Sequence, residues 1–73
     1  MDSNVARASI RFFLAEIRQK LEEAAGIAKA ADACCESGNP AKAVEIALDV
    51  EQLIYEAGTF LNTASLLNRV GKT

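Results

Sequence analysis

The sequence contains no histidine, no tryptophan and only one proline, Pro40. Histidine is the usual general base near neutral pH and a common metal ligand. Glycine-rich phosphate loops and carboxylates paired in a pocket are missing from the pattern as well. We therefore expect a protein that is not an enzyme, with no catalytic residues, no cofactor and no metal site.

Long apolar runs and an excess of positive charge are also lacking. No stretch of about 18 consecutive apolar residues occurs, so we expect no membrane span. Residues 1–5 do not begin a signal peptide, which makes the cytoplasm the expected location. The net charge of -2 and the pI of about 5.0 disfavour an indiscriminate nucleic-acid binder, because such proteins present a large positive field.

Strong helix formers, alanine above all, dominate the 73 residues, and no alternating strand pattern competes with them. This composition predicts an all-α fold in a single domain, residues 1–73. N-cap candidates at residues 2–4 predict helix 1 at about 4–36, and helix 2 is expected at about 41–69. The turn between them, 37–40, reads Ser-Gly-Asn-Pro, in which glycine can end one helix and proline can begin the next. The prediction is an antiparallel two-helix hairpin.

Each predicted helix carries a line of small and apolar residues at alternating spacings of three and four, the heptad pattern of packed helices. On helix 1 the line comprises Ile10, Leu14, Ile17, Leu21, Ala24, Ala28, Ala31 and Cys35. On helix 2 it comprises Ala43, Ile46, Val50, Leu53, Ala57, Phe60, Ala64 and Leu67. A reversal at residues 38–39 sets mostly small residues opposite large ones, so we expect these two lines to form the internal contact of the hairpin.

A further apolar strip runs beside these lines, and in an isolated hairpin this strip would be exposed to water. We expect a second copy to cover it, which makes a homodimeric four-helix bundle. The residues predicted for the dimer interface are Phe13, Ile17, Ile27, Cys34, Ala47, Ile54 and Leu61. The open end of the hairpin, residues 1–20 and 57–73, is basic and residues 21–56 are acidic, so the two copies are expected to lie head to tail.

Several apolar side chains lie outside both strips and form a predicted docking patch for another protein. They are Phe12, Val44, Leu48, Tyr55 and Leu66. In this interpretation the Tyr55 ring is the anchor, because large aromatic side chains contribute strongly at interfaces. The alternative is that these residues are scattered exposed apolar side chains of the kind that every protein surface carries.

One stretch of helix 1 is basic and also bears aromatic residues. The candidate RNA contacts in it are Arg7, Arg11 and Arg18. The alternative is a solvated flank that pairs with the acidic turn of a neighbouring hairpin. The layout of the whole chain resembles the plasmid repressor-of-primer family of small acidic hairpin dimers, and the resemblance implies RNA binding through helix 1. Glu16, Glu22 and Glu23 interrupt that face of the helix.

Cys34 and Cys35 are the residues that most invite a chemical role. Adjacent side chains diverge by about 100° around a helix, so these two thiols cannot easily join each other or clamp one metal. We interpret them as two small buried thiols in a reducing compartment, with a redox or metal-binding role as the alternative.

Together these features predict a small non-enzymatic adaptor or regulatory protein that acts through protein–protein interaction as a hairpin homodimer. One alternative is an RNA-binding regulator with the repressor-of-primer layout. Another is a small secretion-type chaperone that lends its helices to a client. Salt-dependent binding of structured RNA would favour the first alternative, and copurification of a helical client would favour the second.

Overall fold

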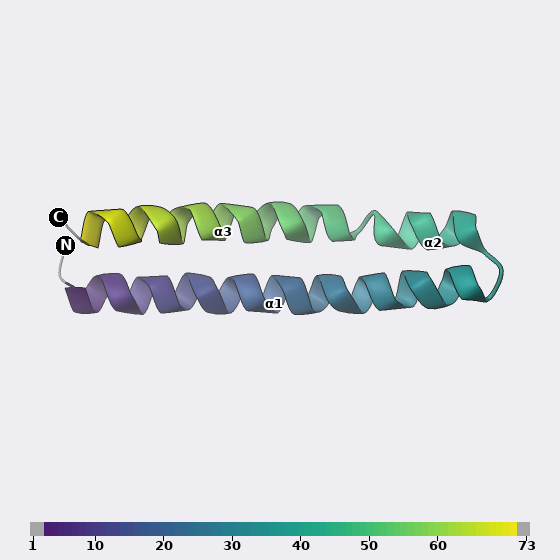
Figure 1. Ribbon diagram of the computed structural model, residues 1–73, viewed down its shortest axis with the longest axis horizontal. Coiled ribbons are helices and arrows are strands. Elements are labelled where there is room, and N and C mark those ends of the chain that lie inside the picture. The colour runs from purple at the N-terminus through teal and green to yellow at the C-terminus, as the bar shows by residue number, and fades with distance from the viewer. Residues whose placement is uncertain (1–2, 72–73) are drawn as a thin grey trace.

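The computed structural model describes residues 3–71 and contains a long helix, α1 (Ser3–Glu36), followed by α2 (Pro40–Ala47) and α3 (Val50–Gly71). Helices α2 and α3 follow one another in a second arm that runs antiparallel to α1, and the start of α1 and the end of α3 lie at the same end of the rod (Figure 1). The rod measures 55 × 14 × 11 Å. The predicted all-α hairpin is confirmed for the described part of the chain, whereas the N-cap candidate Asp2 lies outside it.

The reversal between the arms follows from the local sequence at residues 37–40. Gly38 has a φ of 103° and donates its N–H to the Cys35 carbonyl at 3.0 Å, and the Asn39 N–H reaches the Cys34 carbonyl at 3.2 Å. This is the Schellman pattern, which satisfies the last carbonyls of α1. The Asn39 side chain then accepts the Lys42 N–H at 3.1 Å as the N-cap of α2, and Pro40 is its first residue. The chain therefore reverses at residues 37–39, and Pro40, which the prediction included in the turn, is already the first residue of α2.

The same chemical change is expected to have opposite effects at two glycines. Gly38→Ala is expected to lower the free energy of unfolding by about 1–2 kcal/mol, because an L side chain is strained at this positive φ. Gly26→Ala is expected to raise it by about 1 kcal/mol, because Gly26 is helical and an added Cβ would meet nothing within 4 Å. Urea unfolding of both variants at one protein concentration checks the pair; equal effects of the same sign would contradict this account of the turn.

The second arm is not one continuous helix, and the prediction of an unbroken helix over 41–69 is wrong at Leu48 and Asp49. The Asp49 N–H bonds to the Ile46 carbonyl and the Glu51 N–H to the Leu48 carbonyl, each at 3.2 Å and each three residues back. Such tightened turns interrupt the regular i to i−4 ladder. Asp49 stands directly before α3, and aspartate favours helix starts over helix interiors because its short side chain competes for backbone N–H groups.

The second arm faces α1 with the apolar line predicted for it. Every member of that line is buried or half-buried, and Ala43, Leu53, Ala57 and Ala64 are its buried members. A Cβ added to Gly71 would lie 3.4 Å from the Cβ of Ala6. This close approach sets the register, because residues equally far from these two positions along antiparallel helices lie at the same height.

On α1 the contacting line differs from the predicted one. It comprises Ala6, Ile10, Phe13, Ile17, Lys20, Ala24, Ile27, Ala31 and Cys34, all buried or half-buried. Leu14 and Leu21, predicted to lie inside the hairpin, are 51% and 48% exposed, and Ala28 and Cys35 are exposed as well. The predicted line and the observed line share every second residue. The observed α1 is therefore rotated about its own axis relative to the prediction.

The reason for the rotation is the behaviour of Lys20. A lysine can bury its aliphatic stem along an apolar surface and carry its charge to the edge. The Lys20 ammonium does so, lying 3.9 Å from a Glu56 carboxylate with 25% of the side chain exposed. On the same line the Phe13 and Phe60 rings stack at 5.7 Å between centroids. Lysine is therefore compatible with the hairpin interior, which leaves Leu14 and Leu21 outside.

Candidate interaction surface

The structure distributes the residues predicted for the dimer interface between two environments. The α1 members, Phe13, Ile17, Ile27 and Cys34, are half-buried on the line that faces the second arm. The second-arm members Ala47, Ile54 and Leu61 are exposed, at 57% for Ile54 and 56% for Leu61. Only the second-arm group is therefore fully available to another molecule.

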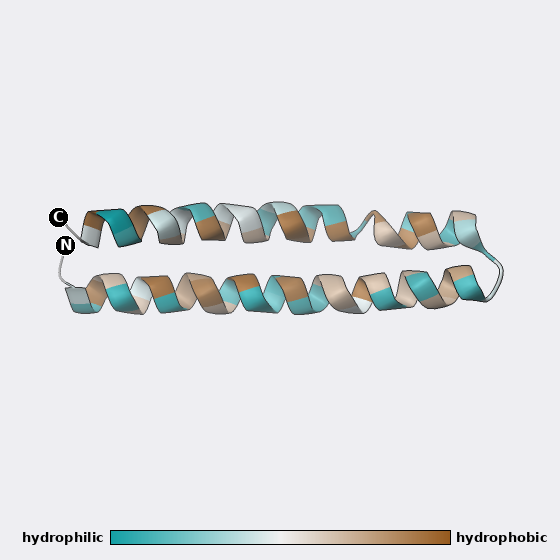
Figure 2. Ribbon diagram, viewed as in Figure 1, coloured by the Kyte–Doolittle hydropathy of each residue, from teal (hydrophilic) through white to brown (hydrophobic). Residues whose placement is uncertain are grey.

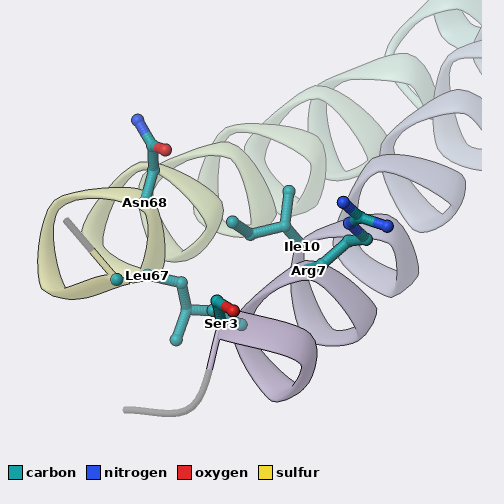
Figure 3. Close-up of a pocket in the computed structure, with 7 residues that line it drawn as sticks. Ser3, Arg7, Ile10, Leu67 and Asn68 are labelled. Carbon is teal, nitrogen blue, oxygen red and sulfur yellow. The ribbon is translucent and has the colours of Figure 1, made fainter.

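A shallow hollow at the open end of the hairpin shows which residues of the two arms share a side. It has a volume of about 170 Å³, and its lining includes Arg7 and Ile10 of α1 and Leu67 and Asn68 of α3 (Figure 3). Arg7 follows the contact-line residue Ala6 by one position, and Asn68 likewise follows Leu67. Starting from Ala6 on α1 and from Leu67 on α3, every second residue of each contact line is therefore followed by a residue that lies on this broad side of the rod.

Continuing these two rows towards the turn gives what we call the apolar face. Its members are Leu14, Leu21, Ala28 and Cys35 on α1, Ala47 on α2, and Ile54 and Leu61 on α3, all of them exposed. By the register, Leu14 lies near the height of Leu61, and Leu21 near that of Ile54. Apolar residues recur along the whole of both arms (Figure 2), and these seven contain no charge.

The opposite broad side, which we call the acidic face, is formed by residues that precede contact positions by one. They include Glu16 and Glu23 on α1, Asp49 before α3 and Glu56 on α3, with Lys42 on α2 as a basic residue near the turn. On this side the Lys20 ammonium forms one ion pair, with Glu56, and only these two side chains have to be ordered to make it. The hairpin is thus amphipathic across its thin dimension, with carboxylates on one broad side and leucine, isoleucine and alanine on the other.

The predicted docking patch is divided by the fold. Val44, Leu48 and Tyr55 lie along the outer side of the second arm, 61%, 61% and 69% exposed. Phe12 and Leu66 are 58% and 51% exposed and lie on the outer edges of different arms, towards the acidic face. The Phe12 ring packs edge-on against Phe13 with 5.4 Å between centroids. The outer surface of the second arm is therefore the one continuous part of that patch.

The arginines predicted to contact RNA all lie exposed on α1. Arg11 and Arg18 border a hollow on α1 together with Leu14 and Ala15. The Arg18 guanidinium is 3.8 Å from a Glu22 carboxylate, and both side chains are more than 70% exposed, which makes this a weak surface pair. These arginines therefore flank the apolar face at the open end of the rod.

The two thiols differ in their surroundings. Cys34 is half-buried, and its Sγ donates to the Asn39 carbonyl at 3.6 Å. Cys35 is exposed, so its prediction as a buried thiol is wrong. Its side chain lies on the apolar face because α1 is rotated relative to the predicted line. Among residues 3–71 no cluster of three or more side chains suited to metal binding is present.

No family model, curated protein or solved structure matches this chain. Within residues 3–71, none of the helices combines the length and the apolar character that crossing a membrane requires.

Proposed function

We propose that this chain is a small non-enzymatic adaptor or regulatory protein of the cytoplasm that acts as a homodimer of helical hairpins. The observation that carries the proposal is the exposure of its large apolar side chains. Within residues 3–71, eleven of them are between 40% and 69% exposed. The buried residues are six alanines and Leu53, so the hairpin alone shields little bulky surface. Apolar surface on this scale is typical of chains that bind other proteins.

The two exposed regions of the rod have different characters, which suggests a division of roles. The apolar face is free of charge, as the core of a helical bundle is. The outer surface formed by Val44, Leu48 and Tyr55 lies beside charged residues such as Glu51. Interfaces with a different protein combine an aromatic anchor with a polar rim. We therefore assign the apolar face to the second copy and the outer surface of the second arm to the protein partner.

A photoreactive amino acid placed at Tyr55 tests the partner role, because Tyr55 has the highest exposure of the large apolar residues described. In cells that produce the protein natively, irradiation is expected to give a covalent adduct heavier than a dimer of the chain. The same amino acid at Lys29, which is exposed on the outer side of α1, is the matched control and is expected to give no such adduct. Adducts no heavier than the dimer at both positions would contradict the adaptor proposal.

A further inference from the structure

We propose that a second copy of this chain covers the apolar face in a head-to-tail arrangement, with α1 packed against the α1 of the partner subunit and the second arm, α2 and α3, against the second arm of the partner subunit. This inference rests on the homodimer proposed above and specifies its face, direction and contacts. The two-fold axis passes near Leu21 and Ile54, in the middle of the apolar face. The assembly is an antiparallel four-helix bundle.

Charge decides which broad side of the hairpin meets the copy. Two acidic faces brought together would oppose Glu16, Glu23, Asp49 and Glu56 with the same carboxylates of the other subunit. Burying like charges is strongly unfavourable, and within residues 3–71 only Glu56 of these four has an ion-pair partner, Lys20. The apolar face meets no such penalty, since its seven members carry no charge and gain by leaving water.

The dimensions of the rod are also sufficient. The broad side of the rod that carries the apolar face is 55 Å long and 14 Å wide, which offers on the order of 800 Å², the area that each partner contributes to a standard protein–protein interface. The apolar face itself, from Leu14 to Cys35 on α1, spans roughly 32 Å of that length at 1.5 Å per residue. A smaller docking segment, such as one short helix, would leave part of this length exposed. A second rod of equal length covers all of it.

The order of large and small residues along the face favours head-to-tail packing. From the open end to the turn, α1 presents Leu14, Leu21 and then Ala28, and the second arm presents the same order with Leu61, Ile54 and Ala47. Head to tail, Leu14 lies over the partner's Ala28 and Leu61 over the partner's Ala47. A parallel arrangement would place large residues on large ones at one end and alanine on alanine at the other, which packs less evenly.

Charges along the outer edge of α1 also favour the head-to-tail arrangement. Arg7 and Arg11 lie at the open end and Asp32 and Glu36 near the turn, all exposed, and within residues 3–71 none of the four takes part in an ion pair. Head to tail, these arginines lie beside the partner's Asp32 and the partner's Glu36. The salt bridges are on the rim, so they select orientation more than they add affinity.

A charge swap tests the direction. Arg7→Glu with Arg11→Glu is expected to raise the dimer dissociation constant about tenfold, as four rim pairs become repulsive. Adding Asp32→Arg and Glu36→Arg to the same chain is expected to restore the wild-type value, because the swapped pairs attract again. Analytical ultracentrifugation measures the constants, and circular dichroism confirms the helix content. Failure of the second pair of changes to restore dimerisation would overturn the head-to-tail arrangement.

Cross-linking tests the face without disturbing its charge. In a chain with Cys34→Ser and Cys35→Ser, Leu21→Cys is expected to cross-link to its own copy with a short bis-maleimide, since Leu21 lies at the axis. Leu48→Cys, equally apolar but on the outer surface, is the control and is expected to remain uncross-linked.

The results of these experiments distinguish the head-to-tail arrangement from the homodimer on which it rests. A wild-type mass of 7.8 kDa, that of one chain, at micromolar concentration would overturn the homodimer itself. A dimeric wild type that cross-links through Leu48→Cys and not through Leu21→Cys would overturn only the apolar face as its interface. Unchanged dimerisation of the Arg7→Glu, Arg11→Glu chain, with loss of binding to structured RNA at low salt, would assign the arginines to RNA and overturn the rim contacts.

Discussion

Leu53→Ala is expected to lower the free energy of unfolding by about 2–4 kcal/mol. Leu53 is 8% exposed and is the only bulky side chain among the buried residues of the described chain. By the register it faces Ala24 of α1, which is also buried and is too small to fill the space that the truncation leaves. The variant therefore loses both the transfer of an apolar side chain from water and the packing around it. Urea unfolding followed by circular dichroism, at one fixed protein concentration, measures the change.

The control for this variant is Leu66→Ala, the same truncation on the same helix. Leu66 is 51% exposed and lies away from both α1 and the apolar face, so the expected change is about 0.5 kcal/mol or less. Similar losses at Leu53 and Leu66 would contradict the assignment of the hairpin interior.

Ala24→Leu is expected to lower the free energy of unfolding by about 1–3 kcal/mol, although leucine is as good a helix former as most residues. Ala24 is 7% exposed, and the close approach of α1 to α3 leaves no room for three further carbon atoms beside Leu53. Ala33→Leu, at an exposed position of the same helix, is the matched control and is expected to change little. The free energies of unfolding are measured as for Leu53→Ala.

Combining Ala24→Leu with Leu53→Ala tests the register directly. If the two residues face each other, the exchange conserves the volume of the layer and is expected to recover at least about half of the summed losses. Purely additive losses would show that Ala24 and Leu53 do not share a layer, and would contradict the register set by Ala6 and Gly71.

Local features of the fold were predictable because neighbouring residues determine them. Gly38, Asn39 and Pro40 each supply a property that one position of the turn requires: a positive φ, a side-chain acceptor and a fixed helical φ. The contact line of the second arm was predictable for a related reason, since every residue on it from Ala43 to Leu67 is apolar. The break at Leu48 and Asp49 was missed because the heptad spacing continues across it, and Asp49 was the signal that could have indicated it.

The candidate interaction surface was predictable on the second arm and not on α1. Ala47, Ile54 and Leu61 follow from the contact line beside them, which the sequence marks clearly. On α1 the corresponding exposed residues are Leu14 and Leu21, which the pattern assigns to the interior because they are more apolar than Lys20. The true surface therefore depends on which of two overlapping lines turns inward.

The sequence by itself determined that this protein is helical, where it reverses and how its second arm meets the first, because propensity, capping and heptad spacing act over a few residues. Only the tertiary structure decided the rotation of α1. That choice depends on Phe13 stacking with Phe60 and on the Lys20 ammonium reaching Glu56, two contacts between residues more than thirty positions apart. Because this rotation places Leu14 and Leu21 on the outside, it also decides which face of the rod is left for another molecule to cover.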